Sequence, residues 1–365
     1  MSAPSPQAAV GSSGISRERR SALEAAKLAA LVAGRWGPAE RERHHLPTGS
    51  ALIGRSGGKR VAWLLVGEQG ERALGPALIW AERQHADEVH LVVEAAPGAA
   101  PDPAGVLARQ TALFAPPRAE VWQVTDGELA PATPAPLPDR PDAPAPADLV
   151  DLLIDEGLEI VVEGGMVRGE VNGLEVARIV HGETTAGVPI DEPMLEVGVG
   201  KADRELTATV HAGLPPVDQL RRVVEIVRSH RRPGAPRHPL NQLTPDRWLR
   251  AVVCRAPGAI GLRELRPAEG ARPRPNLSER DIAVASGRDA DGAPVVVACS
   301  VGIAVDLVPT AADAREVIAP EARLLLAVPE RDDHPGTRRL AARLQRPAEV
   351  VAVPGDWRAL AATDG

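Results

Sequence analysis

Val61-Ala-Trp-Leu-Leu-Val66 decides the fold, because such an uninterrupted apolar run is typical of a strand that is buried on both faces of a parallel sheet. Working outward, Val89-His-Leu-Val-Val93 and Glu120-Val-Trp-Gln-Val124 are expected to form the next two strands. Helices are expected between them at 71–84 and 104–114. The alternation therefore predicts a β-α-β-α-β unit with parallel strands.

The C-terminal part of the chain repeats this plan. Val295-Val-Val-Ala-Cys-Ser300, Arg323-Leu-Leu-Leu-Ala-Val328 and Glu349-Val-Val-Ala-Val353 are predicted strands, with helices at 307–318 and 335–344. The first two strands begin 28 residues apart in both copies. We therefore expect an α/β protein with two Rossmann-like units, at 55–125 and 290–356, whose strands either form two small sheets or share one.

The segment between the two units has a different character. Residues 126–146 are rich in proline and are expected to form a stiff linker. A helix at 147–156 and four strands at 158–163, 166–171, 174–180 and 194–199 follow, with Gly164-Gly165 and Asn172-Gly173 as hairpin turns. With a closing helix at 216–230, this pattern predicts an α+β middle domain at 147–230 that contains an antiparallel meander.

The remaining boundaries follow from composition. Residues 1–15 are small and polar and are expected to form a disordered tail, and 357–365 a second tail. The N-terminal unit, 16–125, is expected to begin with a helix at 17–32, which Gly34 would stop, and a hairpin of 50–54 with 59–66. Residues 231–289, rich in Pro and Arg, are expected to form an irregular connector.

Composition narrows the possible partners and compartment. The 365 residues carry a formal net charge of −7, which argues against nucleic-acid binding by the whole chain. Two cysteines outside any CxxC pair imply neither a disulfide framework nor a structural zinc site, so a cytoplasmic location is expected. No signal peptide and no membrane-spanning apolar run is recognised, and no membrane partner is expected.

The middle domain carries acidic residues on its predicted strands, followed by one lysine: Glu163, Glu170, Glu175, Glu196 and Lys201. A helix followed by such a meander resembles the core of the restriction-endonuclease-like PD-(D/E)XK nucleases, over 147–222. The resemblance implies an Mg²⁺ site formed by the glutamates, with Lys201 steadying the attacking water. No Pro-Asp pair occurs on the expected strand, and no Glu-x-Lys follows it. A degenerate, inactive version of the fold, or glutamates that face solvent on a half-exposed sheet, are the alternatives.

A basic stretch at 219–250 contains eight arginines against two acidic residues. Such a segment is able to lie along a phosphate backbone, so it is the candidate contact for a nucleotide or a nucleic acid. The alternative is a solvated helix face followed by a polar loop. The candidate residues are Arg221, Arg222, Arg228, Arg231 and Arg232.

The C-terminal unit carries a second group of candidates at the carboxyl ends of its strands, where open α/β sheets bind ligands. Ser300 and Gly302 lie in a turn that loosely resembles the nucleophile elbow of serine hydrolases, whose alternative is a tight strand-to-helix connection. Asp332, Asp333 and His334 offer polar ligand groups before Pro335, where helix capping is the alternative. The candidate ligand residues are Ser300, Gly302, Asp306, Glu330, Asp332, Asp333 and His334.

Neither unit contains G-x-G-x-x-G, and the chain has no Walker loop or HExxH motif, so no cofactor is evident and Mg²⁺ is expected only for a nuclease. The leading hypothesis is a non-catalytic ligand-binding or regulatory protein, linked to a nucleotide or nucleic acid. A Mg²⁺-dependent nuclease that uses the middle-domain glutamates is the second hypothesis. A serine hydrolase at Ser300 is the third.

Overall fold

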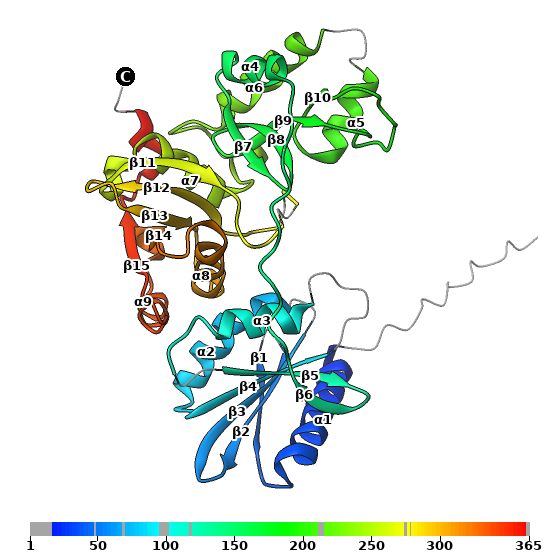
Figure 1. The fold of residues 1–365 in the computed structure, drawn as a ribbon, viewed down its shortest axis with the longest axis vertical. Helices are drawn as coiled ribbons and strands as arrows, with labels where there is room; N and C mark the ends of the chain where they lie inside the picture. The colour runs from blue at the N-terminus through cyan, green and yellow to red at the C-terminus, as the bar shows by residue number, and fades with distance from the viewer. Residues whose placement is uncertain are drawn as a thin grey trace, which may run out of the picture.

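The computed structural model describes residues 17–46, 49–67, 70–94, 102–116, 119–210, 215–273, 276–277 and 279–362, and within them the chain is an α/β protein with three sheets (Figure 1). The expected tail at 1–15 lies outside the described residues. The parallel strands predicted from the apolar runs are confirmed in both units. They belong to two separate sheets, each of which also has antiparallel strands.

The N-terminal sheet has the strand order β1-β2-β3-β4-β5-β6, in which only β3, β4 and β5 run parallel. Its strands are β1 (Glu42–Leu46), β2 (Gly49–Ser56), β3 (Lys59–Val66), β4 (Glu88–Glu94), β5 (Ala119–Thr125) and β6 (Glu128–Pro131). Its helices are α1 (Arg17–Trp36), α2 (Leu74–Arg83) and α3 (Pro103–Thr111).

The deciding strand β3 is buried on both faces, as predicted, because it lies between two helical layers. Trp63 and its neighbours two residues away pack with Leu28 and Val32 of α1. The alternate residues, such as Leu64, pack with α2 and α3. Gly34 was expected to stop helix α1, but this residue is helical and α1 continues to Trp36. The glycine that follows the helix is Gly37, with φ of 81°.

The C-terminal sheet has the order β11-β12-β13-β14-β15, with β13, β14 and β15 parallel. Its strands are β11 (Leu262–Ala268), β12 (Ala283–Asp289), β13 (Pro294–Cys299), β14 (Arg323–Pro329) and β15 (Glu349–Val353). Helix α7 (Pro245–Arg255) packs on one face. Helices α8 (Leu307–Ile318) and α9 (Pro335–Ala342) pack on the other.

The two units match over more elements than the sequence predicts. Each begins with a helix and a β-β-β run before its α-β-α-β part, so α7, β11 and β12 correspond in order to α1, β1 and β2. Residues 231–289 were expected to form an irregular connector, and this expectation is wrong where α7, β11 and β12 form. Prolines and arginines hide the apolar period there, because β11 buries only one face and places arginines on the other.

The two units pack against each other through their paired helices, α2 and α3 against α8 and α9. Their apolar side chains form one continuous core. The chain turns that follow α3 and α9 are joined by a reciprocal pair of backbone hydrogen bonds: Ala115 N donates to Arg343 O (2.8 Å), and Gln345 N donates to Leu113 O (2.9 Å). The turns that follow corresponding helices of the two units are therefore in direct backbone contact.

The middle domain has an antiparallel sheet of order β10-β9-β8-β7, as the meander predicts. Its elements are α4 (Ala147–Asp155), β7 (Glu159–Glu163), β8 (Met166–Val171), β9 (Leu174–Val180), β10 (Met194–Val197), α5 (Gly200–Val210) and α6 (Pro216–His230). Helix α5 was not predicted. The Asn172-Gly173 turn packs on the backbone of α7, where a Cβ on Gly173 would lie 2.2 Å from the carbonyl carbon of Arg247.

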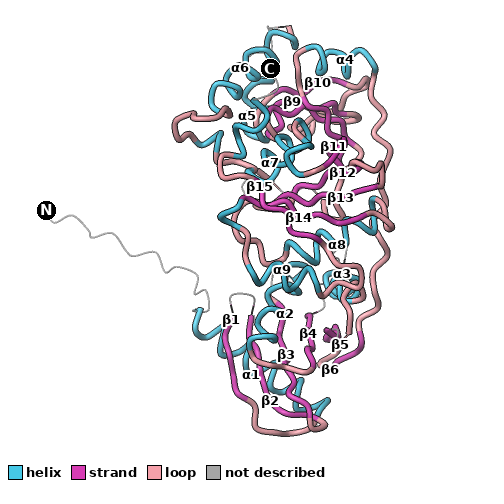
Figure 2. Tube along the Cα trace, turned by 90° about the vertical axis from the view of Figure 1, so that its left-hand side faces the viewer, coloured by secondary structure: helices cyan, strands magenta, loops and turns pink. Residues whose placement is uncertain are grey.

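Figure 2 shows the three parts stacked in a column in which the C-terminal unit lies between the other two. After β6, the proline-rich segment runs along this column from the N-terminal unit to α4. The order of the parts in space therefore differs from their order in the chain, and the middle domain contacts the C-terminal unit.

Among the described helices, none combines the length and apolar character needed to cross a lipid bilayer.

Candidate functional site

Glu163 and Glu170 lie on β7 and β8 and face α7. Arg250 joins them, with Nη1 at 2.9 Å from Glu163 Oε1 and Nη2 at 2.8 Å from Glu170 Oε2. Arg247 Nη1 adds a bond of 2.8 Å to Glu163 Oε2. Burial would lower the pKa of Arg250, but the charges of Glu170 and Glu163 outweigh burial and raise it above its ordinary value. These buried charges therefore join the middle domain to the C-terminal unit.

Glu175 and Glu196 belong to a second ion-pair cluster on β9 and β10. Glu175 accepts hydrogen bonds from Arg168 (2.7 Å) and Arg204 (3.1 Å). Glu196 accepts from Arg178 Nε (3.0 Å) and from the backbone N–H of Thr185 (2.5 Å). Burial acts to raise the pKa of Glu196, but the bonds from Thr185 and Arg178 outweigh it and lower that pKa.

All four glutamates are buried, so the interpretation as solvent-facing side chains is wrong. Each of them bonds to at least one arginine, and among the described residues no group of three or more His, Cys, Asp or Glu side chains is placed to hold a metal ion. Lys201, at the start of α5, is exposed and lies 3.7 Å from Glu205. Arg168 and Arg178 lie on the meander strands β8 and β9, whereas Arg204, Arg247 and Arg250 come from helices that sequence spacing does not link to these strands.

The polar residues of the C-terminal unit are held by local structural contacts. Ser300 is buried, and its backbone N–H donates to Ala327 O. Gly302, with φ of 86°, donates its N–H to Asp332 Oδ2 at 2.7 Å. Asp306 pairs with Arg272 at 3.1 Å. Among the described contacts, no hydrogen bond joins Ser300 to a histidine.

The residues before α9 cap that helix. His334 accepts a hydrogen bond from the N–H of Gly336 (3.0 Å), and Asp333 pairs with Arg338 (2.6 Å). Glu330 begins a short 3₁₀ turn. The capping interpretation of this segment is therefore confirmed for His334.

The basic stretch divides into two groups. Arg221 lies on the outer face of α6 and pairs with Glu156 at 2.8 Å, and Arg222 is exposed beside it. Arg228, Arg231 and Arg232 lie at the other end of α6, where they meet α7 and the C-terminal 3₁₀ helix η5 (Trp357–Ala362). This second group lines a cavity of about 350 Å³ that we call the arginine pocket. The pocket is lined by Gly157, Glu159, Glu170, Val171, Asn172, Arg228, Arg231, Arg232, Pro233, Trp248, Arg255 and Arg358.

Backbone carbonyls, not carboxylates, orient the arginines from α6. Arg231 donates to the carbonyl oxygens of Asn172, Leu240 and Leu243 at 2.6–3.1 Å. Arg228 donates to those of Glu156 and Gly157 at 2.8 and 2.9 Å, and Arg232 to that of Ser229. A carbonyl fixes the direction of a guanidinium without neutralising its charge. Burial lowers the pKa of Arg231 to about 9.

Tryptophans position the innermost guanidinium groups. Trp248 is buried, and the Cζ atoms of Arg231 and Arg358 lie 4.5 Å and 4.8 Å from the centroid of its ring. Arg358 also lies 4.3 Å from the Trp357 ring. Cation–π contacts of this kind stabilise a cation. Arg231 is fully buried and already donates four hydrogen bonds to carbonyl oxygens, so its charge acts on the pocket without direct contact from its N–H groups. The positive charge of the pocket is therefore concentrated at its inner end.

Two glutamates line the pocket, and Glu159 is the one that pairs with a pocket arginine. Glu159 Oε1 lies 2.9 Å from Arg255 Nη1, and Arg255 Nη2 donates to Asn172 Oδ1 at 2.5 Å. Burial raises the pKa of Glu159 to about 7, against the opposing charge of Arg255. Glu170, the other acidic residue of the lining, belongs to the ion pair with Arg250.

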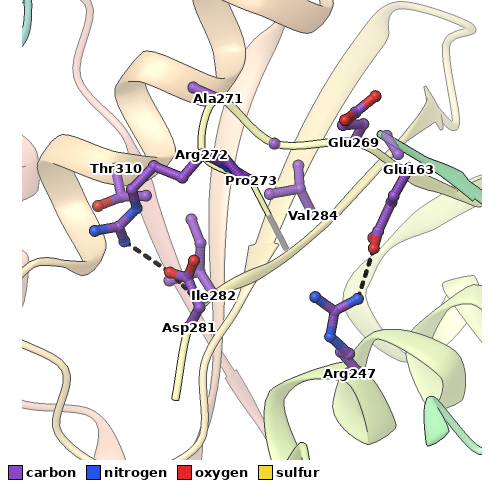
Figure 3. A pocket seen from close by; sticks show the side chains of 12 residues that line it. Glu163, Arg247, Glu269, Ala271, Arg272, Pro273, Asp281, Ile282, Val284 and Thr310 are labelled. Carbon is purple, nitrogen blue, oxygen red and sulfur yellow. Dashed lines mark hydrogen bonds and ion pairs between the residues drawn. The ribbon is translucent and has the colours of Figure 1, made fainter. Parts of the chain in front are cut away.

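A second cavity lies on the opposite side of the same domain contact. Figure 3 shows Arg247 pointing to Glu163 and Arg272 pointing to Asp281 around it. Its volume is about 30 Å³, which is room for about one water molecule. This cavity is too small for a ligand, so the arginine pocket is the stronger candidate of the two at this domain contact.

The sequence pointed to three of the pocket arginines and missed the others. Arg255 lies at the end of α7, and Arg358 lies in η5, within a segment that was expected to be a tail. Nothing in the sequence spacing links either residue to α6. Glu159 follows the same alternation of acidic and apolar residues along the strands as the other middle-domain glutamates, so nothing in the sequence distinguishes it from them.

No protein-family model, no curated protein and no solved structure matches this chain.

Proposed function

We propose that this protein is a non-catalytic binding protein that holds a compact, phosphate-bearing small molecule in the arginine pocket. The observation that carries the proposal is an excess of positive charge in one concave site. Five arginines line the pocket against two glutamates, and one of these glutamates is engaged by Arg250. Arginine is suited to phosphate because its planar N–H groups match two phosphate oxygens at once.

The surroundings favour a compact ligand over an extended phosphate chain. The groove that shares Arg228 with the pocket is lined by Glu156, Arg221 and Glu225 as well, so its charges are balanced. A nucleic-acid backbone would have to follow that groove without gaining from it. The pocket volume of about 350 Å³ lies at the small end of the range of ligand sites, which suits a small molecule.

The test is isothermal titration of the purified full chain with sulfate, inorganic phosphate, pyrophosphate, ADP and a single-stranded oligonucleotide. Saturable binding of at least one compact anion is expected. The variants Arg232→Gln and Arg358→Gln should each weaken that binding roughly tenfold or more, because hydrogen bonds between charged groups contribute about 1.5–3 kcal/mol. Arg338→Gln is the matched control: it removes one positive charge at α9, where Arg338 pairs with Asp333.

Three outcomes would overturn the proposal. The first is that no compact anion binds, and the second is that Arg338→Gln weakens binding as much as the pocket variants do. The third is Mg²⁺-dependent cleavage of the oligonucleotide, which would favour the nuclease hypothesis. Oligonucleotide binding without binding of any compact anion would move the partner to nucleic acid.

A further inference from the structure

Glu159 and Arg255 form an ion pair in the lining of the arginine pocket. Glu159 lines the pocket, and its carboxylate bonds to one guanidinium nitrogen of Arg255 while Asn172 holds another. Its side chain is 22% exposed, so it is reached from the pocket without unfolding. Glu159 therefore partly neutralises the charge of Arg255 from within the pocket.

We infer that Glu159 is a built-in competitor for the ligand: the bound anion replaces it at Arg255, and the released carboxylate takes up a proton from solvent. This inference rests on the proposed function, because it concerns the same pocket. One ion pair is exchanged for another, and one proton moves from the acid form of the buffer to a carboxylate oxygen of Glu159, which leaves the buffer base; no other bond is made or broken. Anion affinity then depends on pH in a way that the ligand's own titration does not explain.

The charges around Glu159 support the exchange. Helix α7 presents Arg255 and Arg250 to it, β8 presents Glu170, and Arg231 approaches from the end of α6. Burial is the largest influence and, with Glu170, raises the pKa of the carboxyl group to about 7 in spite of the arginines. A bound anion adds negative charge and removes the ion pair with Arg255, and both changes favour the protonated form further.

The sign of the pH effect follows from linkage. If the anion and the proton favour each other, binding is strongest where Glu159 is already protonated and weakens as pH rises through about 7. For full exclusion by the carboxylate, apparent affinity falls about tenfold between about pH 6 and about pH 8. Up to about one proton is taken up per anion near pH 8, and little near pH 6.

Sulfate is the probe, because it keeps the same charge over this range whereas phosphate does not. We would titrate the full chain with sulfate at about pH 6, 7 and 8, in two buffers of different ionisation enthalpy, so that proton uptake is measured directly. Glu159→Gln should bind sulfate at pH 8 about as tightly as the wild type does at pH 6, with a flat pH profile. Glu82→Gln is the matched control, since it removes a carboxylate that pairs with Arg339 on α9.

The outcomes separate the two claims. Absence of sulfate binding at every pH, together with no binding of the other compact anions, overturns the proposed function. Binding with the same pH slope in the wild type and in Glu159→Gln overturns the inference alone. Proton uptake is measured on the wild type, so it does not depend on whether the variant folds. Sulfate binding by the wild type without proton uptake near pH 8 also overturns the inference.

Discussion

At the residue scale, arginine has two different uses in this protein. Arg168, Arg178, Arg204, Arg247 and Arg250 each bond to a buried glutamate, so their charges are neutralised inside the structure. The arginines from α6 that line the pocket bond to carbonyls instead. The partner of each arginine decides whether a carboxylate neutralises its charge, and that partner cannot be read from spacing along the chain.

Replacing Arg250 tests the structural role of the glutamates. Arg250→Met removes the arginine that bonds both to Glu170, which is fully buried, and to Glu163. We expect the free energy of unfolding in urea to fall by about 3–5 kcal/mol, as is usual when one member of a buried ion pair is removed. Arg221→Met, which removes an arginine paired at the surface with Glu156, should change it far less. Equal effects of the two substitutions would contradict this role.

At the element scale, the contact between α2 and the turn before α8 depends on a glycine. A Cβ on Gly75 would lie 1.8 Å from the carbonyl oxygen of Val305. Alanine is normally favoured over glycine in a helix by about 0.5–1 kcal/mol. Here the clash is expected to outweigh that preference, because backbone atoms of both units must separate.

Gly75→Ala should therefore lower the free energy of unfolding by about 1–3 kcal/mol. Gly34→Ala in α1 is the control, since nothing lies within 4 Å of its added Cβ, and it should raise stability by about 0.5–1 kcal/mol. Urea unfolding followed by circular dichroism measures both. Stabilisation by both substitutions would show that α2 and the C-terminal unit do not pack as closely as the structure has them.

At the scale of the whole molecule, a shared apolar core holds the N-terminal and C-terminal units together. Leu74, Leu78 and Leu107 of the N-terminal unit pack in the same cluster as Leu307 and Leu340 of the C-terminal unit. Separating the units would expose the apolar faces of four helices at once. Exposed apolar surface of this kind drives association.

We therefore expect two fragments, residues 1–146 and 147–365, to assemble when they are produced together. Size-exclusion chromatography should show one complex of the mass of the full chain. Each fragment alone should aggregate or self-associate through its exposed helices. Elution of two independent, folded monomers from the mixture would contradict the shared core.

The sequence alone determined the parallel strands and the meander, because these depend on local patterns: apolar runs such as 61–66 and turn pairs such as Asn172-Gly173. It did not determine β11, whose single buried face is masked by arginines and prolines. Only the tertiary structure decided which charges meet. Arg250 reaches Glu163 and Glu170 across some 80 residues of chain, and the arginine pocket joins α6, α7 and η5. Electrostatic partners are fixed by distance in space, whereas a sequence records distance along the chain.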